Sequence, residues 1–161
     1  MQQPIRDKIM TNFVEIFKTP STPLEQPYRI VSREAVCEGD IKQLRPGEAI
    51  MYIKEGEEMK VTRQFNSTVA QLEVIIEVFY KTTQSETNRQ APSIAKKLNF
   101  ILAEIIKVVM SDRQRGGFAL NTEELSNGLD IDGYFDQTVG LDCVFTVTYR
   151  HGITDPTIIM N

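Results

Sequence analysis

Residues 92–110 read PSIAKKLNFILAEIIKVVM, and this stretch decides the fold class. At a helical spacing of about 100° per residue, its aliphatic side chains gather on one broad face and most of its charged side chains on the other. The apolar face comprises Ile94, Leu98, Ile101, Leu102, Ile105, Val108 and Val109, widened by Ala95 and Ile106. A helix must bury such a face against another element, so the sequence predicts an amphipathic helix packed on a sheet.

The two clearest strand patterns flank this helix, at residues 71–81 and 139–150. In the first, the residues at alternate positions that face one way are Leu72, Val74, Ile76, Val78 and Tyr80. The opposite face is mixed, because Glu73 and Glu77 favour water whereas Ile75 and Phe79 favour partial cover. We expect that face to be covered either by another subunit or by the first helix.

The N-terminal half predicts a helix, a strand and a hairpin. Residues 4–18 have apolar side chains at helical spacing, and three prolines at positions 20, 23 and 27 then predict a stiff connector. Residues 28–38 predict a strand. Residues 49–64 predict a β-hairpin whose solvated tip is Glu55-Gly56-Glu57-Glu58.

The remaining segments complete a single domain over residues 1–161. Residues 81–90 predict a polar connection, and residues 121–132 a weaker strand with a turn at Asn127-Gly128. The apolar end, Ile158 to Met160, is expected to fray or to dock on a neighbour. The predicted fold class is α+β, an antiparallel or mixed sheet with the N-terminal and central helices on one face.

The composition argues against several classes of function. The net charge is −4, which argues against a surface that grips nucleic acid. Cys37 and Cys143 fall on predicted strands and are expected to be buried thiols, with a disulfide as the alternative. The first residues lack the apolar core of a signal peptide, and no run approaches a membrane span. We therefore expect a soluble protein made in a reducing cytosol.

The sequence gives no positive evidence for an enzyme. His151 is the single histidine, so a metal site built on histidine and cysteine is excluded by count. The acidic residues 55–58 lack the ligand spacing of a calcium loop. Gly116 and Gly117 follow a helix, whereas a phosphate-binding cradle precedes one. We expect no catalytic residue, no cofactor and no metal.

Several short motifs together resemble a known family. The helix IAKKLNFILAEIIKVVMSD is followed by RQRGGFAL, a weak strand and a long strand ending in TYRHGITDP. This succession resembles the tail terminator proteins of long-tailed bacteriophages. Tyr149, Arg150 and His151, followed by Asp155-Pro156, are similar to the closing strand and exit loop of that family. The N-terminal helix, strand and hairpin also fit its order.

The resemblance implies a structural virion protein. Tail terminators are α+β proteins that form a hexameric ring at the head-proximal end of the tail tube. The ring stops tail polymerisation and provides the surface for head–tail joining, with DNA passing through the lumen. The implied partners are further copies of the chain, the tail tube protein, neck and connector proteins, and a sheath protein if the tail is contractile. The implied location is the tail or neck of the virion, assembled in the host cytoplasm, with no membrane and no cofactor.

A cyclic ring needs two different patches that pair. Phe100 breaks the polar arc of the central helix; it is expected either to fold back on a loop or the first helix, or to meet a partner. Our ring hypothesis pairs Arg113 and Arg115 with acidic residues of the next subunit; the alternative is that both groups are solvated surface. Those acidic candidates are Glu55, Glu57 and Glu58, and the closing-strand candidates are Tyr149, Arg150 and His151.

Three alternatives stay open. The nearest is another ring protein of the neck, which differs in the surface that it caps. The second, from a different class, is a small α+β enzyme or ligand-binding domain with a pocket under the central helix. The third is an adaptor that binds one protein by strand addition at the hairpin edge.

Overall fold

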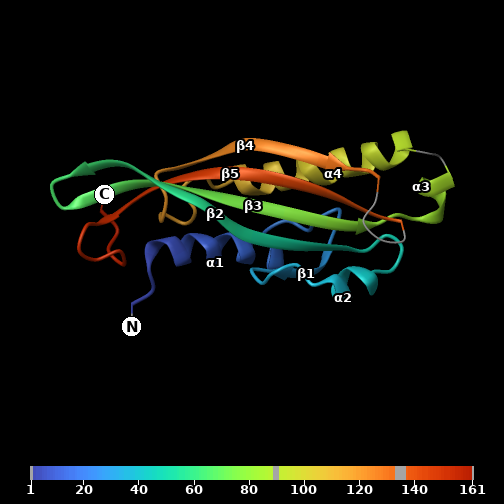
Figure 1. Ribbon diagram of the computed structural model, residues 1–161, viewed down its shortest axis with the longest axis horizontal. Coiled ribbons are helices and arrows are strands. Elements are labelled where there is room, and N and C mark those ends of the chain that lie inside the picture. Colours follow the sequence, from blue (N-terminus) through green and yellow to red (C-terminus); the bar gives the residue numbers. More distant parts are fainter. Residues whose placement is uncertain (1, 89–90, 133–136, 161) are drawn as a thin grey trace.

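The computed structural model describes residues 2–88, 91–132 and 137–160. Its strands form one five-stranded sheet in the order β1-β2-β3-β5-β4 (Figure 1). They are β1 (Tyr28–Ser32), β2 (Ala49–Gln64), β3 (Ser67–Lys81), β4 (Asn121–Asp130) and β5 (Thr138–Gly152). β1 pairs with β2 in parallel and all other neighbours are antiparallel, so the sheet is mixed.

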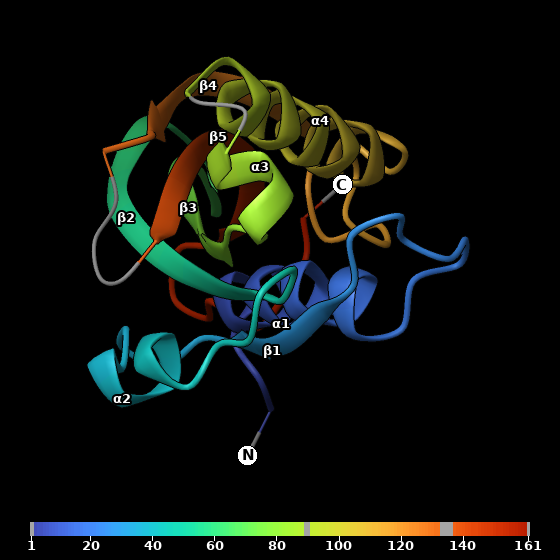
Figure 2. The ribbon, with the colours of Figure 1, turned by 90° about the vertical axis from the view of Figure 1, so that its right-hand side faces the viewer.

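Two long helices cover one face of this sheet, as the sequence predicts. They are α1 (Ile5–Lys18) and α4 (Ala91–Met110); the shorter helices are α2 (Glu38–Lys42) and α3 (Gln84–Asn88). Figure 2 shows the sheet curving around the face that holds α1 and α4. The α+β fold class with two helices on one face is confirmed.

The core lies between these two helices and the inner face of the sheet. Leu98, Ile101 and Ile105 of α4 are fully buried, as are Ile9 and Phe13 of α1. Alternate residues of β3 and β5 pack against these helical side chains. They lie on one face of the sheet because the register pairs Leu72 with Val147 and Val74 with Phe145. The amphipathic pattern of residues 92–110 thus does what its spacing predicts.

Among the described residues, the outer face of the sheet is covered at one end by α2 and the residues that follow it. Ile41 of α2 and Leu44 pack there against Ile50, Tyr52 and Phe79. Farther along, the ion pair of Lys54 with Glu77, 2.6 Å, lies on the same face. The first helix packs on the inner face, so the expectation that it covers the outer side of residues 71–81 is wrong.

The hairpin has a different turn from the predicted one. β2 runs without a break through Glu55–Glu58, where a register shift occurs, and the chain reverses at Phe65-Asn66. Gly56 allows β2 and β3 to lie close together, because a Cβ at that position would be 2.8 Å from the Cβ of Glu73. Gly128 is similar: it lies within β4, and a Cβ there would meet the Asp142 carboxylate at 2.9 Å. Neither glycine marks the turn that the sequence suggested.

Other boundaries also shift. β1 ends at Ser32, and the chain turns into α2 where a strand to residue 38 was expected. α3 forms within the predicted polar connection, whose residues 89–90 lie outside the described ranges.

The C-terminal segment packs on its own chain as far as Ile159, which forms a β-bridge with His151. The Gly152 amide donates to the Ile158 carbonyl at 3.2 Å, and the Ile5 amide donates to the Pro156 carbonyl at 3.0 Å. These bonds hold the segment in place, so the expected fraying is wrong, whereas docking on a neighbour stays a prediction, since Ile158 is 46% exposed. Within the described ranges, no helix combines the length and hydrophobicity needed to cross a bilayer.

The two cysteines lie in different environments, which corrects one expectation. Cys143 is buried on β5 as predicted, whereas Cys37 is exposed just before α2; both are free thiols. Burial, followed by the charges of Glu124 and Asp142, raises the pKa of the Cys143 thiol to about 12.

We predict that only Cys37 reacts with a thiol reagent in the native protein at pH 8, because Cys143 is buried and protonated. A colour assay with Ellman's reagent should give one equivalent without denaturant and two in guanidinium chloride. The Cys37→Ser variant should give none until it unfolds. A native Cys37→Ser protein that reacts within minutes would contradict this placement.

Candidate functional site

The distal end of the β2–β3 hairpin projects beyond both long helices, at the left of Figure 1. We call residues 59–69 the arm. Three of its apolar side chains are exposed to water: Met59 at 61%, Val61 at 52% and Phe65 at 102%. Apolar side chains gathered at the end of a projecting hairpin are typical of an interaction surface.

Phe65 is also in an unusual backbone conformation. Its φ is +46°, in the left-handed region that glycine and asparagine adopt at little cost and a bulky aromatic residue rarely adopts. The residue therefore costs conformational energy and makes no compensating burial within its own chain. Residues held in this way are good candidates for a functional role.

A network of charges fixes the base of the arm. The Glu55 carboxylate of β2 pairs with Arg6 of α1 at 2.6 Å and with Arg33 at 2.7 Å. Glu58 pairs with Lys60 and, at 3.4 Å, with Arg6, and it accepts a hydrogen bond from the Tyr149 hydroxyl. These contacts join β2, α1 and β5 where the arm leaves the core.

The network holds Glu58 as a carboxylate. Burial by itself raises the pKa of this carboxyl, but hydrogen bonds from Lys60 and Tyr149 and the charges of Lys60 and Arg6 outweigh burial and lower the pKa. The pKa of Tyr149 is raised by burial and by its hydrogen bond to Glu58. The pair is thus a charge-assisted hydrogen bond with the proton on the tyrosine.

His151 lies in the same region and is almost buried, at 9% exposure. Its Nδ1 is 2.8 Å from the Gly152 carbonyl oxygen and its Nε2 is 3.4 Å from the Lys60 ammonium. Its ring centroid is 5.7 Å from that of Tyr149. These partners are not the nucleophile and carboxylate that a catalytic histidine needs, so the contacts fit a structural role.

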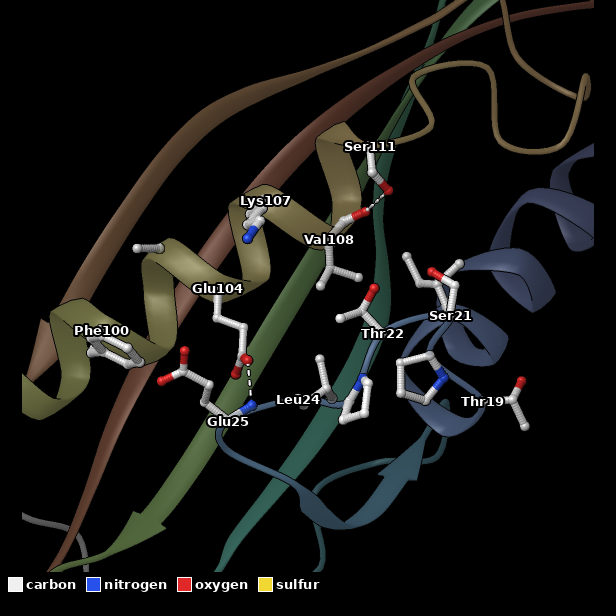
Figure 3. A pocket seen from close by; sticks show the side chains of 14 residues that line it. Thr19, Ser21, Thr22, Leu24, Glu25, Phe100, Glu104, Lys107, Val108 and Ser111 are labelled. Carbon is white, nitrogen blue, oxygen red and sulfur yellow. Dashed lines mark hydrogen bonds between the residues drawn. The ribbon is translucent and has the colours of Figure 1, made fainter.

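A second feature lies between α1, the proline-containing connector and α4. We call it the α1–α4 groove; its volume is about 500 Å³ (Figure 3). It is lined by Ile16, Thr19, Pro20, Ser21, Thr22, Pro23, Leu24, Glu25, Phe100, Ala103, Glu104, Lys107, Val108 and Ser111. The Glu104 carboxylate accepts hydrogen bonds from the backbone amides of Glu25, at 2.6 Å, and Gln26, at 3.2 Å, so it holds the connector beside α4.

The structure brings together only some of the candidates from the sequence. Glu55, Glu58, Tyr149 and His151 meet at the base of the arm, within one chain. Phe100, half exposed at 50%, is apart from them on the rim of the groove and has not folded back into the protein. It remains a candidate for a partner contact.

Arg115 is wrong as a surface candidate, because its side chain is fully buried. Its guanidinium lies 5.1 Å from the ring centroid of Phe13 and donates to the Val109 carbonyl at the end of α4. A cation suits this position, where the helix leaves carbonyl groups unpaired. Arg115 is thus a cap for α4 and cannot reach a neighbour's glutamates.

The proposed acidic partners are also largely engaged. Glu55 and Glu58 form ion pairs within the chain, whereas Glu57 is exposed. Arg113 is partly exposed; its Nε donates to the Thr122 carbonyl at 3.3 Å and its Nη2 lies 3.8 Å from Glu123. Arg150 is half-buried on β5.

The arm and the groove are the features that the sequence interpretation missed. Residues 59–64 were expected to be a returning strand, so Met59 and Val61 were not considered exposed at a projecting end. The Phe65-Asn66 pair carried a weak signal, because asparagine is common in turns. The groove depends on where the connector lies, which no local pattern predicts.

Over the described ranges, no group of three or more histidine, cysteine, aspartate or glutamate side chains is placed to hold a metal ion. The chain matches no family model. No curated protein matches it either.

We predict that Arg115→Ala lowers the free energy of unfolding by about 2–4 kcal/mol, because it removes the cap of α4 and the contact with Phe13. Urea denaturation followed by circular dichroism measures this. The control is Arg113→Ala, whose more exposed contacts should be worth about 0.5 kcal/mol or less. Equal effects of the two substitutions would contradict the assignment of Arg115 as a cap.

We predict that Glu58→Gln lowers the free energy of unfolding by about 1–3 kcal/mol at pH 7. The substitution removes the negative charge of a largely buried side chain that contacts Lys60, Arg6 and Tyr149. Since the pKa of Glu58 is lowered in the folded state, its contribution is complete above the ordinary value of 4.5 and is lost as the pH falls through the lowered value. The difference between the wild-type protein and the variant should therefore shrink progressively below pH 4.5. The control Glu57→Gln changes an exposed residue and should be as stable as the wild-type protein both at pH 7 and below pH 4.5.

Proposed function

We propose that this chain is a structural protein of a bacteriophage virion, a tail terminator that forms a ring of six copies at the head-proximal end of the tail tube. The ring stops tail polymerisation and provides the surface for head–tail joining, while DNA passes through its lumen. The observation that carries the proposal is the arm, whose exposed Met59, Val61 and Phe65 serve no purpose in an isolated subunit. The resemblance to the terminator family, which spans most of the chain, supplies the rest.

Other features support an assembly role. In the part of the chain that the structure describes, most of the outer face of the sheet is open, and the edge strands β1 and β4 each have one side without a strand neighbour. The net charge of −4 suits a lumen through which DNA must slide without binding. The proposed partners are the tail tube protein, the neck and connector proteins, and a sheath protein if the tail is contractile. The proposal involves no covalent chemistry and no cofactor.

A ligand-binding domain is the second candidate, favoured by the α1–α4 groove. Its volume of about 500 Å³ is within the range of small-molecule sites. One of its polar groups is already engaged, however, because the Glu104 carboxylate accepts two hydrogen bonds from the connector. The groove also lies beside α4, not under its apolar face, where the sequence-based alternative placed a pocket.

The proposal is tested with bare tail tubes that still elongate when tube protein is added. We expect the purified chain, labelled with gold at a C-terminal tag, to bind at one end of each tube and to stop growth there. Electron microscopy of tube length and label position measures both effects.

Separate incubation with DNA-filled heads that lack tails distinguishes the neighbouring alternative. Binding to heads and not to tubes would indicate a different ring of the neck. A protein that binds neither particle and leaves tube growth unchanged would contradict a terminator function.

A further inference from the structure

The chain carries both a projecting apolar element and an apolar hollow, and they lie in different parts of the molecule. We infer that Phe65 of the arm inserts into the α1–α4 groove of the next copy of this chain. This inference rests on the proposed function, since it names the contact by which a ring would close. The groove of each copy is then occupied by the arm of a second copy.

The arm has the properties of an inserting element. Phe65 is completely exposed at its end, in a strained conformation that burial on a partner would offset. Between residues 59 and 66 the arm has two cations and no carboxylate: Lys60 pairs with Glu58 at the base of the arm, and Arg63 is exposed near its end. The arm therefore presents an aromatic side chain next to positive charge. Aromatic residues of this kind are common anchors of interfaces.

The groove has the complementary properties. Leu24 and Val108 line its interior, and Phe100 at its rim exposes half of its surface (Figure 3). A second aromatic ring can pack on Phe100 edge to face or in an offset stack. The carboxylates of Glu25 and Glu104 lie on the same side of the groove as Phe100 and outnumber Lys107, the one cation among the described residues of its lining, so a basic arm meets a net negative charge there.

The geometry requires the contact to be between molecules. In Figure 1 the arm extends away from α1 and α4, past the N-terminal end of α1. The groove is formed at the other end of α1, by its last turn and the residues that follow. A contact between two different patches is heterologous, and repetition of it generates a closed ring when the rotation permits.

Two substitutions separate the two halves of this contact. Phe65→Asn removes the aromatic ring, and asparagine tolerates the left-handed conformation, so the variant should melt at a higher temperature than the wild-type protein at concentrations where both are monomers. Ala103→Arg places a long cation in the groove from an exposed helical position, where arginine is a good helix former. Each variant should associate about tenfold or more weakly in sedimentation velocity over a range of concentrations.

Matched controls lie elsewhere on the surface. Leu125→Asn removes an apolar side chain of β4 that is 57% exposed, and Ala35→Arg adds the same cation at an exposed position outside the groove. Neither control should weaken association. Increasing salt should weaken the wild-type association, because charge complementarity contributes to it.

The decisive sample is an equimolar mixture of the Phe65→Asn and Ala103→Arg chains. One chain has an intact groove and the other an intact arm, so the mixture should form a dimer and no larger species. If the arms instead pair with each other, Phe65→Asn abolishes association and Ala103→Arg has no effect, which overturns the inference.

Two further results would also overturn it: association of both variants as tight as that of the wild-type chain, and a wild-type chain that sediments as a monomer at every concentration. A wild-type chain that caps tail tubes but associates regardless of both substitutions would refute this contact and leave the terminator function standing.

Discussion

The structure depends on a mismatch of length between its strands and its helices. β2 has 16 residues and rises about 53 Å, whereas α1 and α4 have 14 and 20 residues and rise about 21 Å and about 30 Å. Helices packed on one face of such a sheet cannot cover all of it. The far end of the hairpin is therefore left as the arm, outside the core, with apolar side chains exposed to water.

An uncovered hairpin is marginal by itself, and the network at its base compensates for this. Arg6 at the start of α1 connects Glu55 and Glu58 of β2, and Tyr149 of β5 donates to Glu58 from the other side. The C-terminal segment adds a hydrogen bond from the Ile153 amide to the Asn66 carbonyl, 2.9 Å, next to the turn. The arm is thus held in position at its base and its turn. A protein that binds with a projecting element benefits from such preorganisation, because less conformational entropy is lost on binding.

The core could be predicted from the sequence because its signals are local and periodic. The apolar stripe of residues 92–110 and the alternation in residues 71–81 and 139–150 each require one face to be buried, and the structure buries those faces. The errors came from glycines and charges, whose meaning depends on distant residues. Gly56 and Gly128 suggested turns, but each allows a close approach of Glu73 or Asp142 from the next strand.

The places of the charged residues were mispredicted for the same reason, because they too depend on distant residues. Arg115 in a sequence full of polar residues suggests exposed surface, yet the fold places it over Phe13 with its guanidinium on a helix end. Glu55 and Glu58 suggested a solvated tip, whereas Arg6, about fifty residues earlier in the chain, pairs with both. The groove was unpredictable for a related reason: it exists because Glu104 holds a connector that comes almost eighty residues earlier.

The central claim is that this chain is built to assemble with copies of itself through unlike surfaces. The mass of the wild-type protein by light scattering, with negative-stain images of the same sample, tests that claim most directly. The account predicts a particle of six times the 18.4 kDa chain mass that appears as a six-fold ring with a central hole. A closed dimer with two-fold symmetry, in which like surfaces pair, would contradict it.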